Sequence, residues 1–199
     1  MIISLIGFMG CGKSSVGRKL SQLLCCRFID LDEAVEEVAG KRIPEIFASE
    51  GEAAFRRLET QILKDILSAE PERQYAPCEV GRVNEIPTTI SAVLALGGGT
   101  VMTPECAEMV RENTYCIYLR ASVNTLLERL SSNTSNRPLL TRDPHAALQG
   151  AQRRGNPSLH SRIDELMSQR SSTYEKTANI IIDTDDKSIE QICSEIVRP

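Results

Sequence analysis

Residues Gly7 to Ser14 have the types and spacing of a phosphate-binding loop. They read Gly-Phe-Met-Gly-Cys-Gly-Lys-Ser and fit the pattern G-x-x-x-x-G-K-[ST]. Glycines let the backbone turn tightly and bring its N–H groups close to a polyphosphate. In such a P-loop the lysine reaches the β- and γ-phosphates of a nucleotide, and the serine hydroxyl binds Mg²⁺. These roles fall on Lys13 and Ser14.

The flanking sequence supports this interpretation over an ordinary glycine turn. The apolar run Ile2 to Ile6 predicts a buried strand before the loop. One face of a helix is predicted after it, from the spacing of Val16, Leu20, Leu23 and Leu24. Strand, glycine loop and helix in this order are what a P-loop requires.

Two acids follow at the end of the next predicted strand, Arg27 to Asp32. Asp30 and Asp32 are two residues apart, so on a strand both would point to the same side. Parallel sheets bind ligands beyond the carboxyl ends of their strands, where this pair would face the phosphates and their metal. The alternative is that one of them only caps a helix beginning near Glu33.

Two helices are predicted to present arginines near apolar faces. The first, from about Glu50 to Leu67, has Arg56 and Arg57 beside a buried face of Phe55, Leu58, Ile62 and Ile66. Either a solvated surface or a local partner such as Glu59 would also explain these arginines.

The second helix is predicted from Leu159 to about Lys176. Arg170 falls within its apolar stripe of Ile163, Leu166, Met167 and Tyr174. A guanidinium there needs an anion, unless it snorkels to solvent or pairs with a structural acid.

A triple glycine and a polar flap complete the candidate site. Gly97, Gly98 and Gly99 follow the predicted buried strand Ile90 to Leu96 and would let a ligand lie against bare backbone. Arg137 lies in Arg-Pro-Leu-Leu after a polar, aperiodic stretch, which predicts a mobile lid over about residues 131–158. When this lid closes, it would bring Arg137 to the transferring phosphoryl group and exclude water.

The expected fold is a single P-loop α/β domain over residues 1–199. Strands alternating with helices predict three α/β/α layers, a five-stranded parallel sheet and a helical segment that binds the acceptor. The irregular stretch at about 68–89 is expected to be an insertion.

Composition excludes several classes of protein. A net charge of −4 and 4% aromatic residues argue against nucleic acid as a partner. The sequence contains no apolar run long enough for a membrane span and no basic leader for a signal peptide. The seven cysteines show no C-x-x-C spacing and are expected to be reduced thiols of a cytoplasmic protein. We expect a monomer.

Together these residues predict a kinase for a small polyhydroxy carboxylic acid. Arginine forks suit a carboxylate, and Asp32 suits a hydroxyl that attacks the γ-phosphate of ATP.

With these motifs in this order, the chain resembles the shikimate kinase family over essentially its whole length. The resemblance rests on the P-loop, Asp30-Leu31-Asp32, the run Phe55 to Glu59, the triple glycine, Arg137 to Leu140, and Arg170 before Tyr174.

The resemblance implies a role for each of these motifs. The family's ATP site would include Gly10, Cys11, Gly12, Lys13, Ser14, Ser15 and Arg137. Its shikimate site would include Asp32, Arg56, Gly97, Gly98, Gly99 and Arg170. Lys13, Asp32 and Arg137 would be catalytic, and Ser14 and Asp30 would hold Mg²⁺, with Asp30 acting through water.

Some features depart from the family pattern. The stretches 68–89 and 141–158 look longer than usual, and Asp185-Asp186-Lys187 lacks the arginine often found near adenine. Two other functions remain open: a kinase for another hydroxy acid such as gluconate, and a nucleotide-binding module without catalysis.

Overall fold

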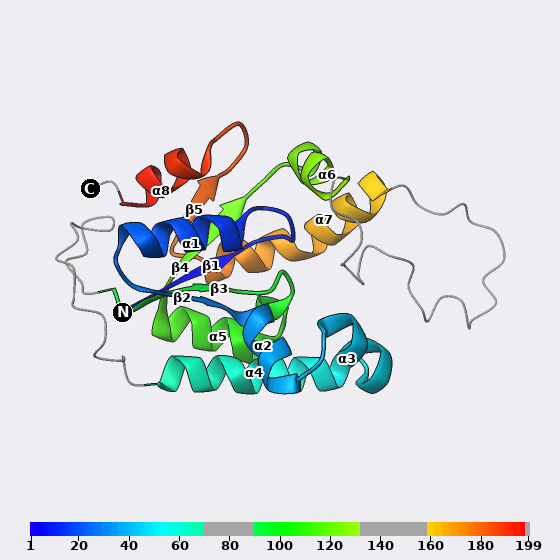
Figure 1. The fold of residues 1–199 in the computed structure, drawn as a ribbon. Helices are drawn as coiled ribbons and strands as arrows, with labels where there is room; N and C mark the ends of the chain where they lie inside the picture. Colours follow the sequence, from blue (N-terminus) through cyan, green and yellow to red (C-terminus); the bar gives the residue numbers. More distant parts are fainter. Residues whose placement is uncertain (70–89, 132–158, 198–199) are drawn as a thin grey trace.

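Five parallel strands make the central sheet within the described residues of the computed structural model, which are 1–69, 90–131 and 159–197 (Figure 1). The strand order is β2-β3-β1-β4-β5. The strands are β1 (Ile2–Ile6), β2 (Arg27–Asp30), β3 (Ala92–Ala95), β4 (Thr114–Arg120) and β5 (Ile180–Asp183). Because all five run in one direction, their carboxyl ends meet along one edge, as the sequence predicts.

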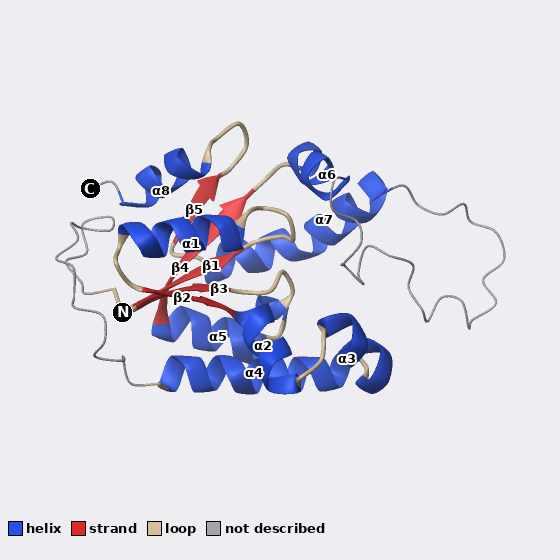
Figure 2. Cartoon of the chain, viewed as in Figure 1, coloured by secondary structure: helices blue, strands red, loops and turns tan. Residues whose placement is uncertain are grey.

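Helices cover both faces of this sheet, with α1 and α8 on one side and α4 and α5 on the other (Figures 1 and 2). The helices are α1 (Lys13–Leu23), α2 (Leu31–Ala39), α3 (Ile43–Glu50), α4 (Glu52–Ser68), the 3₁₀ helix η1 (Thr100–Met102), α5 (Pro104–Asn113), α6 (Val123–Ser131), α7 (Leu159–Thr177) and α8 (Ile189–Val197). Each face has its own apolar core. Leu20 and Ile192 belong to one, and Leu63 and Val110 to the other.

The P-loop joins β1, which is mostly buried, to α1, which packs one face against the sheet. β3 is buried along its length between β1 and β2, with Val93 paired to both Ile3 and Phe28. α1 approaches the sheet so closely that a Cβ on Gly17 would lie 2.5 Å from the Phe28 ring. Any larger residue at Gly17 would therefore force either the Phe28 ring or the helix to move.

The predicted strand Arg27 to Asp32 is wrong at its end. β2 stops at Asp30, and Asp32 lies in the first turn of α2. The cause is local, since Oδ1 of Asp30 accepts a hydrogen bond of 3.1 Å from the backbone N–H of Asp32 and caps the helix.

The predicted buried face of α4 is partly wrong as well. Phe55 and Ile62 are buried, but Leu58 and Ile66 are only partly so, and their places are taken by Glu59 and Leu63. No helix in the described part of the chain has the length and apolar character needed to cross a bilayer.

Candidate active site

The loop between β1 and α1 has the backbone geometry of an anion site. Gly7, Gly10 and Gly12 have φ angles of 142°, 85° and 100°. A side chain at Gly7 would also collide with the carbonyl oxygen of Leu119, 2.5 Å from an added Cβ. α1 begins directly after Gly12 with no side-chain cap and no acid in its first turn. Its first N–H groups and the positive end of its dipole are therefore available to a phosphate.

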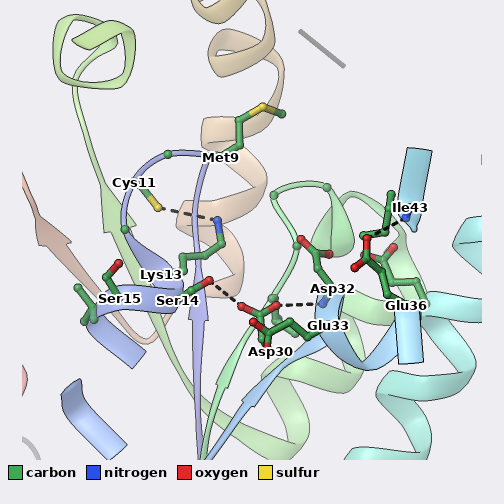
Figure 3. A pocket seen from close by; sticks show the side chains of 18 of the residues that line it. Met9, Cys11, Lys13, Ser14, Ser15, Asp30, Asp32, Glu33, Glu36 and Ile43 are labelled. Carbon is green, nitrogen blue, oxygen red and sulfur yellow. Dashed lines mark hydrogen bonds between the residues drawn. The ribbon is translucent and has the colours of Figure 1, made fainter. Parts of the chain in front are cut away.

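Lys13 folds back over this loop (Figure 3). Its Nζ donates to the carbonyl oxygens of Gly7 and Phe8, at 2.9 and 3.1 Å. Cys11 lies differently, since it is 1% exposed and its backbone N–H donates to the Phe8 carbonyl at 3.2 Å. Lys13 and Cys11 both line the cavity, and Cys11 shapes the loop from within; a phosphate contact of either residue stays a prediction.

Ser14 and Asp30 form an oxygen pair beside the loop. The Ser14 hydroxyl donates to Oδ2 of Asp30 at 2.6 Å, while the other oxygen of Asp30 caps α2. Asp30 therefore caps a helix, as the alternative interpretation holds, and also contacts the P-loop serine (Figure 3). A hydroxyl and a carboxylate this close are the hard oxygen donors that Mg²⁺ prefers, so the pair fits that ion.

Asp32 is the most strongly perturbed acid at the site. Burial, followed by the charge of Asp30, raises its pKa from 3.8 to about 6, against the opposing effects of Lys13 and Arg56. A Cβ on Gly97 would lie 2.7 Å from its Oδ1, so glycine leaves room for this carboxylate. Although Asp32 lies on a helix and not on a strand, it still reaches the edge where the sequence places it.

Arg56 is held over the triple glycine by a buried acid. Its Nη1 donates to Oε2 of Glu59 at 2.7 Å, and a Cβ on Gly99 would lie 2.6 Å from Nη2. Glu59 is 1% exposed and accepts a second hydrogen bond of 2.6 Å from the Thr100 hydroxyl. The local ion pair and the site role predicted as alternatives for Arg56 are therefore compatible, because Glu59 orients the guanidinium along the cavity. A second acid, Glu52, lies 3.4 Å from Nη2.

Gly98 links the glycine loop to α7. Its carbonyl oxygen accepts from the Tyr174 hydroxyl at 2.5 Å and from Nη1 of Arg170 at 3.4 Å. The Arg170 guanidinium also lies 5.8 Å from the centre of the Phe8 ring in the P-loop. Arg170 therefore contacts both loops, but it is not one of the residues lining the cavity.

One cavity of about 790 Å³ joins these groups. The P-loop lines one part, and the glycine loop with α2, α3 and α4 lines another. Of the predicted site residues, the cavity wall includes Gly10, Cys11, Gly12, Lys13, Ser14, Ser15, Asp30, Asp32, Arg56, Gly97, Gly98 and Gly99. Arg137, all of the predicted lid after Ser131, and most of the predicted insertion fall outside the described residues.

Sequence reasoning missed Arg129, which lines the cavity from α6. Its guanidinium donates to the carbonyl oxygens of Cys11 and Thr184, each at 3.2 Å. The available signal was its place in the last turn of α6, between the inward-facing Leu126 and Leu130. Arg129 fastens the P-loop to the segment after β5, near the cavity residues Lys187 and Ile189.

Comparison with known proteins assigns this arrangement to a family. The shikimate kinase family model matches residues 9–73 and 64–199. The chain belongs to the shikimate kinase family. It is therefore an ATP-dependent kinase.

Individual relatives agree over nearly the full length. The shikimate kinase of Marinomonas sp. (strain MWYL1) is 36% identical over 98% of this chain and 89% of its own. That of Bordetella pertussis (strain Tohama I) is 37% identical over 98% of this chain and 76% of its own.

Solved structures of shikimate kinases match as well. The enzyme from Acinetobacter baumannii in complex with shikimate is 28% identical with a TM-score of 0.78, covering 99% of this chain and 90% of that one. The Aquifex aeolicus enzyme is 31% identical with a TM-score of 0.70, covering 98% and 94%.

Proposed function

We propose that this kinase transfers the γ-phosphate of ATP to the 3-hydroxyl of shikimate, giving shikimate 3-phosphate and ADP. This reaction belongs to the pathway to chorismate and the aromatic amino acids. The observation that carries the proposal is the shared cavity, in which the P-loop faces an acid and an arginine suited to a hydroxy acid. Family membership and full-length similarity to shikimate kinases support the choice of acceptor.

The donor half of the cavity binds the phosphates of ATP. The N-terminus of α1 and the glycine backbone present N–H groups, and Lys13 exchanges the carbonyl oxygens of Gly7 and Phe8 for phosphate oxygens. Ser14 and Asp30 would hold Mg²⁺. When bound, that ion supplies positive charge that stabilises the negative charge on the transferring phosphoryl group.

The acceptor half positions and activates the hydroxyl. With a pKa of about 6, Asp32 is mostly ionised at neutral pH and is basic enough to accept a proton. The 3-hydroxyl oxygen attacks the γ-phosphorus in line, its proton passes to Asp32, and the bond to the β,γ-bridging oxygen breaks to release ADP.

The carboxylate of shikimate is held by arginine. Arg56 is oriented by Glu59, and a planar guanidinium can bind a carboxylate with two parallel hydrogen bonds. Arg170, beside the Gly98 carbonyl, is the second candidate for this carboxylate. Arg137 is proposed to contact ATP from the lid.

Further properties are proposed on the same basis. The described cysteines, at positions 11, 25, 26, 106, 116 and 193, are free, which supports a cytoplasmic location. We propose that the enzyme acts as a monomer, since one chain contributes both halves of the cavity.

The test is ADP release by the purified protein with ATP and Mg²⁺, comparing shikimate, gluconate and no acceptor. Strong stimulation by shikimate alone is expected. Stimulation by gluconate instead would keep the phosphoryl transfer but overturn the acceptor assignment. Nucleotide binding without stimulation by either acid would favour a binding module.

A further inference from the structure

Glu36, on α2, reaches across to the first turn of α3. Its Oε1 accepts a hydrogen bond of 2.9 Å from the backbone N–H of Ile43, the first residue of that helix (Figure 3). Its Oε2 lies 3.5 Å from Nη1 of Arg42. N–H groups in the first turn of a helix have no partner within the helix, so Glu36 supplies one from a neighbouring element.

The two contacts of Glu36 differ in strength. The Arg42 side chain is 63% exposed, and an ion pair in such a position contributes little. The hydrogen bond to Ile43 is partly buried and has a carboxylate oxygen as acceptor, which makes it the stronger of the two. The contact that matters is therefore the one to the backbone of α3.

α3 depends on such contacts for its position. It has eight residues, too few for a helix that is stable by itself. On the α4 side it is held by packing of Phe47 on Phe55, with ring centres 4.9 Å apart. On the α2 side, Glu36 binds its first residue.

Both helices face the acceptor half of the cavity. Ile43, Pro44 and Phe47 of α3 line its wall. Asp32 and Glu36 also line it, and they are four residues apart on α2, so they lie on one helix face. The helix that carries the proposed base thus also carries the group that fastens the opposite wall.

We propose that Glu36 is a positioning residue that clamps the start of α3 to α2 and thereby sets the distance between Asp32 and the apolar wall of the acceptor pocket. This inference rests on the proposed function for its kinetic effect. The clamp itself concerns only contacts within the chain.

The experiment compares three variants in steady-state kinetics with shikimate and ATP. Glu36→Ala removes the clamp, whereas Glu36→Gln keeps an oxygen that can accept from Ile43. Glu45→Ala is the matched control, because Glu45 accepts a 3.0 Å hydrogen bond from the N–H of Arg42 at the same helix start but does not line the cavity.

Glu36→Ala is expected to raise KM for shikimate about tenfold, the effect of losing one hydrogen bond to a charged group. KM for ATP and kcat should stay near their wild-type values, because the contacts of Glu36 are to Arg42 and Ile43 at the start of α3. Glu36→Gln and Glu45→Ala should stay near the wild-type KM. An unchanged KM in folded Glu36→Ala, or an equal rise in Glu45→Ala, would overturn the proposal.

Hydrogen–deuterium exchange over Ile43–Glu50 separates this inference from the proposed function. Faster exchange of α3 in Glu36→Ala than in Glu36→Gln is expected even without substrate. If the wild-type protein did not phosphorylate shikimate, the proposed function would be refuted. The exchange measurement would still show whether Glu36 holds α3 against α2. Equal exchange in both variants would refute it.

Discussion

Replacing Asp32 by asparagine should make the protein more stable and far less active at pH 8. Asparagine has nearly the same shape but no charge, so the substitution isolates the energetic effect of a buried carboxylate. In the folded protein the pKa of Asp32 is raised from 3.8 to about 6, chiefly by burial and next by Asp30. Ionising this group is therefore harder in the folded chain than in the unfolded one.

The sign of the stability effect follows from this raised pKa. Well below the unfolded-state pKa of 3.8, Asp32 is protonated in both states and carries no penalty. As the pH rises through 4 to 6, the unfolded chain ionises first, and the folded state loses relative stability. A shift of about two pKa units corresponds to roughly 3 kcal/mol. Because the cavity admits water, we expect about 2 kcal/mol, or a melting temperature about 4 to 8 °C higher for the variant.

The assay is thermal unfolding of wild type and Asp32→Asn at pH 8 and at pH 4, without substrate. The stabilisation should be fully present at pH 8 and mostly lost at pH 4. Turnover of shikimate should fall by about a hundredfold or more, while ATP binding is retained, because the variant lacks the proposed base. A variant less stable than wild type at pH 8, or a difference independent of pH, would refute the reasoning about burial. Ordinary turnover would remove Asp32 from the mechanism.

Four other results are expected. Arg170→Leu should abolish use of shikimate while ATP still binds, as measured by calorimetry with each ligand; unchanged acceptor affinity in a folded variant would contradict it. Glu59→Ala should raise KM for shikimate, and urea denaturation should show a free energy of unfolding lower by about 2 to 3 kcal/mol, because Arg56 and Thr100 lose a buried partner. A loss of stability without a change in KM would mean that Glu59 does not orient Arg56. Gly7→Ala should destabilise the fold by several kcal/mol, since its Cβ would meet the Leu119 carbonyl at a positive φ, and a melting curve like that of wild type would contradict it. In the wild type, kcat/KM for shikimate should fall as the pH drops through about 6, where Asp32 takes up a proton. A kcat/KM that does not change between pH 5 and 8 would argue against a base at this position.

The stability and activity effects at Asp32 have one physical origin. Burial of the ionised carboxylate lowers the stability of the folded state, and the same burial brings the pKa of Asp32 close to the working range of a base. Asp30 contributes to the same shift while it caps α2 and binds Ser14. Asp30 and Asp32 thus have different environments, which suits the different roles proposed for them.

The sequence alone determined the order of elements and the position of the P-loop. The loop from Gly7 to Ser14 is contiguous, so its spacing and flanking apolar runs are enough to identify it. The five parallel strands follow in the same way from short buried runs alternating with helical periodicity, because both signals are local. The triple glycine and Arg56 stood out in the sequence because their types are unusual at their positions, and all four residues line the cavity.

Tertiary structure decided how distant residues meet. Asp32 was placed on a strand, because the sequence does not show whether Asp30 continues β2 or caps α2. Glu59 reads as a surface acid until α4 is seen to bury it between Arg56 and Thr100, residues from two separate segments. Arg129 and Glu36 likewise act through contacts with other elements. Periodicity shows which side of a helix faces inward, but the partner on that side is fixed only when the helices pack together on the sheet.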